Sequence, residues 1–374
     1  MLGSLLCMSA LSLEHAVAAD ASCGVAPSRI DDWEVARPDE VGLDAAILCA
    51  LGSKLMAPDR PNIHGVVVVR HGKLVYEVDA SGDDRKWDIA LGVVNYDATM
   101  QHDTRSVSKS VVSLLVGIAI ERGLLAGADA PVMPFFPEYA DLKTPEKDGI
   151  LLRHLLTMTA GLAWNEDIPW TSPNNTERRM YESSDPYRYV LGRDAAYKPD
   201  ERWKYNSGAT ALLGAVLKKS TGKSLSDFSK EALFDPLHIQ SFEWVPMING
   251  DAAAGGGLRL RPRDMAKIGQ LILNGGEWQG QRIVSQDWVR QSTEPRFRGW
   301  EPMRYGYHWW TGHSRVRDRF VDWIAAVGIG GQRIFIVPAL DLVVVTTAGL
   351  YRDAKQGLLV RSILDDNVLP AVRD

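Results

Sequence analysis

The sequence has few cysteines, no long apolar run and no excess of basic residues. Its three cysteines form no C-x-x-C pair or Cys/His cluster, so nothing indicates a structural zinc site. No stretch reaches the roughly 18 apolar residues that a membrane-spanning helix needs. The 42 Lys and Arg against 47 Asp and Glu argue against a nucleic-acid partner. A chain of 374 residues, 45% of them hydrophobic, can bury a large core without disulfide or metal support.

Several common motifs are also missing. The segment Thr221-Gly222-Lys223-Ser224 contains G-K-S, but Leu217 stands where a phosphate-binding loop requires glycine. Gly255-Gly256-Gly257 is not part of a G-x-G-x-x-G dinucleotide motif. The eight histidines are dispersed, with no H-E-x-x-H, and no G-x-S-x-G elbow indicates an α/β-hydrolase. The sequence therefore implies no metal and no organic cofactor.

The N-terminal residues 1–19 resemble a signal peptide. An apolar run is followed by Ala16-Val17-Ala18-Ala19, which is typical of a signal peptidase site. We expect the mature chain in the periplasm or outside a bacterial cell. Removal of this segment leaves Cys23 and Cys49, which either pair in an oxidising compartment or remain as two buried thiols.

Strand patterns lie at both ends of the chain and helix patterns lie between them. This order predicts an α+β fold, an antiparallel sheet flanked by helices with a mainly helical inserted subdomain, rather than alternating βαβ units. We assign residues 20–124 and 255–374 to the sheet region and residues 125–254 to the helical subdomain. The expected strands are a hairpin at 66–69 and 74–76 and a C-terminal meander at 305–310, 320–325, 333–337 and 342–347.

One motif with catalytic potential remains, the S-x-x-K of Ser106-Val107-Ser108-Lys109. Ser220 and Lys223 match the same pattern, but they fall in a turn between two predicted helices. Ser106 instead opens the most apolar predicted helix, with Lys109 one turn further on the same face. Lysine can activate a serine only if its pKa is lowered, and we expect desolvation or a nearby cation to lower it. The alternative is that Ser106 is an ordinary helix N-cap and Lys109 a solvated side chain.

Five segments together resemble the penicillin-recognising serine hydrolases, a family of class C β-lactamases, penicillin-binding proteins and related esterases. The resemblance extends over about residues 65–350, and the motifs are most similar to those of the nylon-oligomer hydrolases in this family. It implies a β-lactamase/transpeptidase-like fold. The segments are RSVSKSVVSLLVGIAIERG (105–123), LLRHLLTMTAGLAWNED (151–167), WKYNSG (203–208), a Gly-rich link with the following helix (256–269) and GIGGQ (328–332).

The resemblance implies a role for each matching residue. Ser106 would be the nucleophile that forms an acyl-enzyme, Lys109 its base, and Tyr205 a proton relay. The oxyanion hole would consist of the backbone N–H groups of Ser106 and Ile329. Tyr205 could otherwise be a core aromatic residue. Trp164, Glu166, Ser207, Gly330 and Gly331 are candidate substrate-binding residues, with structural packing as the alternative.

The third motif departs from the family pattern, because residues 323–331 contain no Lys, Arg or His. β-Lactamases and transpeptidases place a basic residue there for the substrate carboxylate. The resemblance and this departure together favour a small-molecule ester or linear amide as substrate. A β-lactamase, a D-Ala carboxypeptidase-type enzyme and a non-catalytic ligand-binding member of the fold remain alternatives. Substrate identity and oligomeric state are left open.

Overall fold

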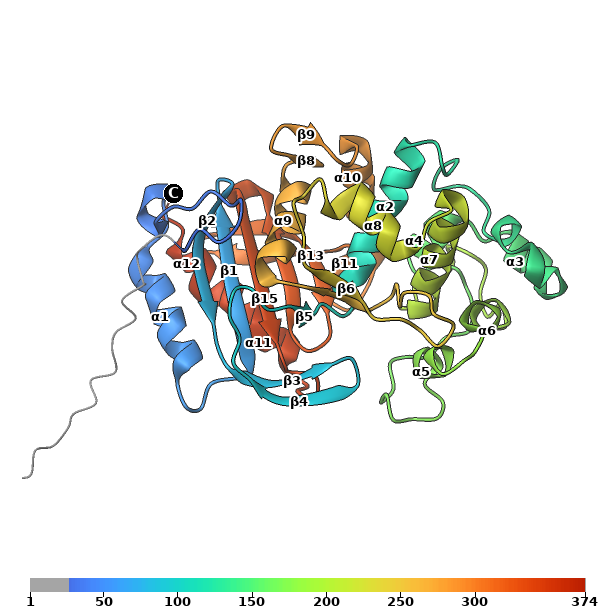
Figure 1. Cartoon of the computed structure of the whole chain (residues 1–374), viewed down its shortest axis with the longest axis horizontal. Helices are drawn as coiled ribbons and strands as arrows, with labels where there is room; N and C mark the ends of the chain where they lie inside the picture. Colours follow the sequence, from blue (N-terminus) through green and yellow to red (C-terminus); the bar gives the residue numbers. More distant parts are fainter. Residues whose placement is uncertain (1–26, 374) are drawn as a thin grey trace, which may run out of the picture.

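The computed structural model describes residues 27–373 and contains an eight-stranded antiparallel sheet (Figure 1). The predicted signal peptide at 1–19 lies outside the described residues. The strand order is β10-β11-β12-β13-β14-β15-β1-β2. The expected fold class is confirmed. The strands are β1 (Ile63–Arg70), β2 (Lys73–Asp79), β10 (Phe297–Arg298), β11 (Arg304–Tyr305), β12 (Trp310–Val316), β13 (Arg319–Gly328), β14 (Gln332–Val337) and β15 (Leu342–Ala348).

The N-terminal and C-terminal parts of the chain meet inside this sheet. β1 pairs with β2 on one side and with β15 on the other, with Val67 opposite Val345. The valines at 66–69 are at most 1% exposed, as expected for a strand covered on both faces. The predicted hairpin is confirmed, and so are the meander strands predicted at 320–325, 333–337 and 342–347. The strand predicted at 305–310 is wrong, because β11 ends at Tyr305, β12 begins at Trp310 and the chain bends at 306–308 between them. The sheet can form only when segments nearly 300 residues apart come together.

Helices cover the sheet. α9 (Pro262–Leu273) packs on β14, β15 and β1, where a Cβ on Gly269 would lie 2.6 Å from a Val343 methyl group. Glycine therefore allows α9 to approach the sheet closely. α1 (Ala45–Met56) packs against the C-terminal helix α12 (Leu369–Ala371), and α11 (Gln356–Ile363) precedes it. Cys49 in α1 is disulfide-bonded, and the predicted partner Cys23 lies outside the described residues.

The helical part of the molecule lies beside the sheet (Figure 1). α2 (Val107–Glu121) is buried along almost its whole length and contacts both β13 and α7 (Ser207–Thr221). An all-round apolar helix of this kind belongs in a core. The shorter helices are α3 (Pro145–Asp148), α4 (Leu152–Leu156), α5 (Thr176–Tyr181), α6 (Pro186–Leu191), α8 (Leu225–Ser229) and α10 (Gln286–Thr293). No helix among residues 27–373 is both long and apolar enough to cross a bilayer.

Three small sheets were not anticipated from the sequence. β3 (Gly82–Lys86) and β4 (Ile89–Val94) form a hairpin, and β8 (Glu277–Trp278) pairs with β9 (Gln281–Arg282). The third has the order β5-β7-β6, from β5 (His102–Asp103), β7 (Leu258–Leu260) and β6 (Phe242–Trp244). This sheet matters for the site, because β5 leads directly into the S-x-x-K segment. The proposed division at residues 124 and 254 stays a prediction.

Candidate active site

Ser106 stands at the junction between β5 and α2. It occupies the N-cap position of α2, yet its side chain makes no capping hydrogen bond. The residue before it, Arg105, has a φ of 51°, a left-handed conformation that is uncommon for a side chain of this size. The chain therefore turns sharply at Arg105, and the Ser106 hydroxyl remains available for other partners.

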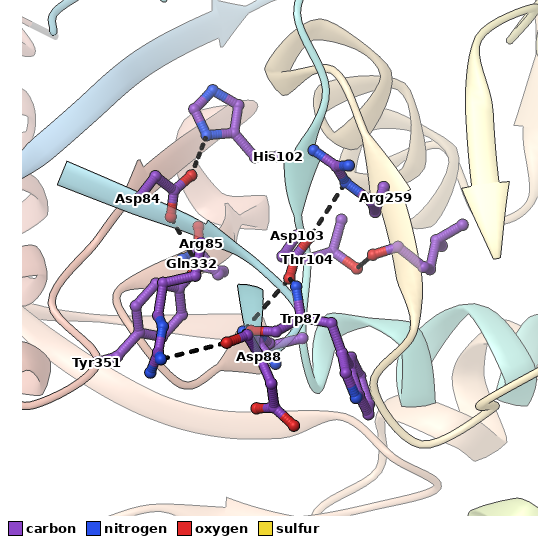
Figure 2. Close-up of polar contacts among 12 residues, drawn as sticks. Asp84, Arg85, Trp87, Asp88, His102, Asp103, Thr104, Arg259, Gln332 and Tyr351 are labelled. Atoms are coloured by element: carbon purple, nitrogen blue, oxygen red, sulfur yellow. Dashed lines mark hydrogen bonds and ion pairs between the residues drawn. The ribbon is translucent and has the colours of Figure 1, made fainter. Parts of the chain in front are cut away.

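The unusual backbone at Arg105 is held by a network around its guanidinium, whose partners Trp87, Asp103 and Tyr351 are labelled in Figure 2. Arg105 Nη2 donates to the Trp87 carbonyl at 2.6 Å and lies 3.3 Å from the Asp103 carboxylate. The guanidinium also stacks against the rings of Trp87 and Tyr351, 5.3 and 4.9 Å from their centroids. Asp103 in turn pairs with Arg259 Nε at 3.0 Å. The β3–β4 hairpin and β7 thus brace the backbone immediately before Ser106.

Lys109 lies one helical turn after Ser106 and points back toward it. Its ammonium donates to Ser106 Oγ at 3.0 Å and to the Gly255 carbonyl at 2.6 Å. Only 1% of Lys109 is exposed. The alternative of a solvated helix lysine is therefore wrong, and the structure joins the two polar residues of the S-x-x-K segment directly.

Tyr205 completes this group from the segment that precedes α7. Its hydroxyl lies near Ser106 and Lys109, both of which affect its pKa, and Lys109 Nζ is 4.9 Å from the ring centroid. The ring packs against Trp300 and Trp310, at 4.9 and 6.2 Å between centroids. Tyr205 is thus a buried aromatic residue, but its hydroxyl faces the serine and the lysine.

Two carboxyl groups stand near the Lys109 ammonium. Burial, followed by the charge of Glu166, raises the pKa of Glu177 from 4.5 to about 7. Burial by itself would lower the pKa of Lys109, but Tyr205, Glu166 and Glu177 outweigh it, and the pKa of Lys109 is raised. Burial also raises the pKa of Tyr205, against the opposing effect of Lys109. The expectation of a lowered lysine pKa is therefore wrong, because the sequence showed no acidic neighbours for this side chain.

Glu166 links three of the predicted pocket residues. It accepts hydrogen bonds from the Ser207 backbone N–H at 2.8 Å, the Ser207 hydroxyl at 2.9 Å and Trp164 Nε1 at 2.5 Å. Trp164 is 6% exposed and also borders a cavity of about 510 Å³ on the side of Arg179 and Arg193. Glu166 therefore anchors the start of α7, directly after Tyr205, and Trp164 and Ser207 orient this carboxylate.

The turn between β13 and β14 approaches the start of α2. A Cβ on Gly328 would lie 2.3 Å from the Thr104 carbonyl oxygen, a contact that only glycine permits. Ile329 follows and is 54% exposed. The Arg333 guanidinium donates to the carbonyls of Gly328 and Gln332, the residues that flank the turn. The backbone of Ile329 is consequently held close to the segment that carries Ser106.

The two glycines of this turn, Gly330 and Gly331, allow the backbone conformation of the turn. Gly330 and Gly331 have φ values of 90° and 100°, which L side chains rarely adopt. The Gly330 N–H donates to the Gln356 side chain at 2.6 Å, and the Gly331 carbonyl accepts from Thr346 at 2.8 Å. These contacts give both glycines a structural role. A direct role in substrate binding stays a prediction.

Comparison with known proteins identifies the family. The β-lactamase family matches residues 55–357, so the chain belongs to this family. It is 27% identical over 266 residues to the 6-aminohexanoate-dimer hydrolase of Paenarthrobacter ureafaciens, covering 66% of this chain and 65% of that protein. It is 26% identical over 192 residues to the lovastatin esterase of Penicillium rubens, covering 46% of each chain. The chain thus spans less than two thirds of the length of both relatives.

Solved structures give the same fold. The octameric penicillin-binding protein homologue from Pyrococcus abyssi superposes with a TM-score of 0.66 at 18% sequence identity. The superposition covers 88% of this chain and 79% of that one. Identity at this level supports the β-lactamase/transpeptidase-like architecture and says nothing about substrate.

Sequence reasoning identified Ser106, Lys109 and Tyr205, which the fold brings into contact. It missed two residues that act on Lys109. Gly255 accepts a hydrogen bond from the Lys109 ammonium, and Glu177 raises the pKa of Lys109 through its charge. Glu177 lies in a polar segment far along the chain from Ser106, so no motif in the sequence indicated that it belongs to the site. Gly255 stands in a Gly-rich stretch that matches no nucleotide-binding motif, and nothing in the sequence indicated that its carbonyl accepts a hydrogen bond from Lys109.

Proposed function

We propose that the protein is a serine hydrolase that cleaves esters or linear amides through an acyl-enzyme. The observation that carries this proposal is the 3.0 Å contact between the Lys109 ammonium and Ser106 Oγ, buried and with the Tyr205 hydroxyl beside both. A serine hydroxyl needs an adjacent base to act as a nucleophile, and this arrangement supplies one. A purely ligand-binding protein has no need of all three groups.

Acylation begins in the population in which Lys109 has lost its proton. The amine takes the Ser106 proton as Oγ attacks the substrate carbonyl carbon, and a tetrahedral oxyanion forms. The Tyr205 hydroxyl donates its proton to the leaving alkoxide or amine nitrogen and is reprotonated from Lys109. The bond from the carbonyl carbon to the leaving group breaks, which leaves an ester between Ser106 and the acyl group.

Deacylation reverses these proton transfers with water in place of the leaving group. The Tyr205–Lys109 pair removes a proton from water, and the resulting hydroxide attacks the acyl carbon. The bond to Ser106 Oγ then breaks and the serine recovers its proton, releasing a carboxylic acid. Because both steps use the same proton path, loss of any one of the three side chains should stop turnover.

Two backbone N–H groups are proposed for the oxyanion. The Ser106 N–H lies at the start of α2, where N–H groups lack intrahelical acceptors and the helix dipole favours negative charge. The second is the N–H of Ile329, in the turn that Gly328 brings against Thr104. Donors fixed in this way stabilise the oxyanion without reorganisation.

The charges around the site support a neutral substrate. The β13–β14 turn contains no basic residue, and Arg259 pairs with Asp103 at 3.0 Å and Glu243 at 3.5 Å. Glu166 and Glu177 add negative charge near Lys109. A substrate carboxylate at this position therefore meets repulsion. The two relatives, a 6-aminohexanoate-dimer hydrolase and a lovastatin esterase, support linear amides and esters as candidate substrate classes.

Intact-protein mass spectrometry tests the proposal. The full chain is exposed to a panel of p-nitrophenyl esters, anilides and penicillins, beside Ser106→Ala. We expect an acyl adduct on the wild-type chain that is absent from the variant, with peptide mapping to Ser106. We also expect a kcat/KM for a neutral ester at least roughly tenfold above that for nitrocefin, because the carboxylate lacks a charge-assisted partner.

Each of the other possible results would favour a different function or nucleophile. An adduct with ester turnover that persists in Ser106→Ala would identify the wrong nucleophile. Nitrocefin turnover equal to the ester would make the β-lactamase alternative the better one. Binding without any adduct or turnover across the panel would favour the non-catalytic member of the fold.

A further inference from the structure

Three buried side chains outside the proposed active site converge on one point. They are His64 in β1, Asp84 in β3 and His102 in β5, and they are 0%, 5% and 1% exposed. One ligand atom from each lies within 4.8 Å of the others. Figure 2 shows the His102 ring and the Asp84 carboxylate facing each other. We propose that these three residues bind a divalent transition-metal ion, of which Zn²⁺ fits best.

The distances suit ligands of one ion better than a hydrogen-bonded cluster. Nδ1 of His64 is 3.6 Å from Asp84 Oδ2, and Nδ1 of His102 is 3.9 Å from the same oxygen. Both exceed the length of an N–H···O hydrogen bond. Two ligands on a tetrahedral Zn²⁺ with bonds of about 2.0–2.1 Å lie about 3.3 Å apart. The two nitrogen–oxygen distances would have to shorten by only about 0.3 and 0.6 Å to match ligands of one Zn²⁺ ion.

The hydrogen bonds of Asn62 orient the His64 ring. The Asn62 amide nitrogen donates to the Asp83 carbonyl at 2.7 Å, and its oxygen lies 3.1 Å from His64 Nε2. That oxygen can only accept, so Nε2 carries the proton of the neutral imidazole. Nδ1, which has no hydrogen-bond partner, then directs its lone pair toward the Asp84 carboxylate. A cation between these atoms removes the repulsion between them.

Both histidine rings are shielded from solvent, since His64 is 0% and His102 1% exposed. Neutral imidazole is the ligand form of histidine. Two imidazoles and one carboxylate favour Zn²⁺ over Ca²⁺ or Mg²⁺, which prefer shells of oxygen alone.

Two tyrosines support the Asp84 carboxylate. The Tyr351 hydroxyl donates to Oδ1 at 3.1 Å, and the Tyr96 hydroxyl donates to Oδ2. The Tyr96 ring stacks on His102 with 3.9 Å between centroids. Hydrogen bonds that fix a ligating carboxylate are common around protein metal sites.

The position of the cluster indicates a structural role. It joins β1, β3 and β5, three segments that share no continuous sheet. β5 continues through Asp103 and Arg105 into Ser106, and Tyr351 contacts both Asp84 and Arg105. A bound ion would therefore stiffen the segment that presents Ser106. The metal site does not depend on the proposed hydrolase function.

Metal titration of the untagged full chain tests this inference. After removal of metal with EDTA, Zn²⁺ is titrated by calorimetry, bound metal is quantified by mass spectrometry, and Co²⁺ is added to follow its visible d–d absorption. We expect one ion per wild-type chain, an intense tetrahedral Co²⁺ spectrum and a higher melting temperature with Zn²⁺. Asp84→Asn should weaken binding by roughly 100-fold or more, since loss of even a supporting residue costs 10- to 100-fold.

The control is His71→Gln, which removes an exposed histidine paired with Asp341 at 2.9 Å. It should bind Zn²⁺ as the wild type does. Equal binding by wild type and Asp84→Asn would overturn the proposal, as would less than one ion per wild-type chain. If Asp84→Asn does not fold, the wild-type Co²⁺ spectrum decides, because a weak octahedral spectrum indicates surface carboxylates rather than this site.

Discussion

Substituting Glu177 by glutamine should stabilise the protein in a way that depends on pH. Glu177 lies in α5, partly buried near Glu166, and desolvation raises its pKa from 4.5 to about 7. A group whose pKa is higher in the folded than in the unfolded state binds its proton more tightly when folded. The folded protein therefore loses stability as pH rises from about 4.5 through about 7 and this carboxyl group ionises.

The size of the effect follows from the shift. Moving a pKa from 4.5 to about 7 corresponds to about 3 kcal/mol, at 1.36 kcal/mol per unit. Glutamine stays neutral at every pH and keeps the shape of the side chain. The difference in unfolding free energy, variant minus wild type, should thus be small below about pH 4.5, grow through the intervening range, and level off near 3 kcal/mol above about pH 7.

Urea denaturation followed by tryptophan fluorescence, at steps between about pH 4.5 and pH 8.5, measures this difference. The matched control is Glu182→Gln, at the C-terminal end of the same helix, where the carboxylate pairs with Arg178 and is 56% exposed. That variant should follow the wild type within about 0.5 kcal/mol at every pH. Parallel curves for Glu177→Gln and wild type would refute the reasoning, because they would show that Glu177 ionises as freely in the folded state as in the unfolded one.

Three further outcomes are expected. Ser106→Ala should lower ester kcat/KM by about 10⁴- to 10⁶-fold and leave the free energy of unfolding near that of the wild type. Lys109→Met should also lose about 1–3 kcal/mol of stability, because it removes the buried ammonium that donates to Ser106 and to the Gly255 carbonyl; equal free energies of unfolding in urea for the two variants would contradict this. Because the pKa values of Lys109 and Tyr205 are both raised, log kcat/KM should increase with a slope near one from about pH 6 to pH 9. A plateau of kcat/KM near neutral pH, in stopped-flow or steady-state assays, would argue against this pair as the base. Gly328→Ala places a Cβ 2.3 Å from the Thr104 carbonyl oxygen and should lower kcat by displacing the β13–β14 turn. The control Gly357→Ala, whose Cβ would have no neighbour within 4 Å, should leave kcat unchanged, and equal kcat values for the two variants would show that the turn is not part of the site.

The sequence alone was enough for the parts of this protein that depend on local patterns. The valine run of β1, the short β-rich segments of the C-terminal meander and the apolar run of α2 are each local signals, bounded by turn or helix-end residues, that predict a buried strand or helix. The S-x-x-K spacing likewise places Ser106 and Lys109 one helical turn apart. Tyr205 was reached only through the resemblance to a family, since no local spacing connects it with Ser106.

Only the tertiary structure decided the chemical state of these groups. The direction of the pKa shift of Lys109 depends on Glu166 and Glu177. Glu166 lies 57 residues and Glu177 lies 68 residues further along the chain than Lys109. The cluster of His64, Asp84 and His102 likewise could not be predicted from the sequence, because the spacing of these residues matches no metal-binding motif. They meet only because β1, β3 and β5 fold together. Charge interactions act through space and fall off within a few ångströms, so the sequence can name the residues but the fold determines which of them face each other.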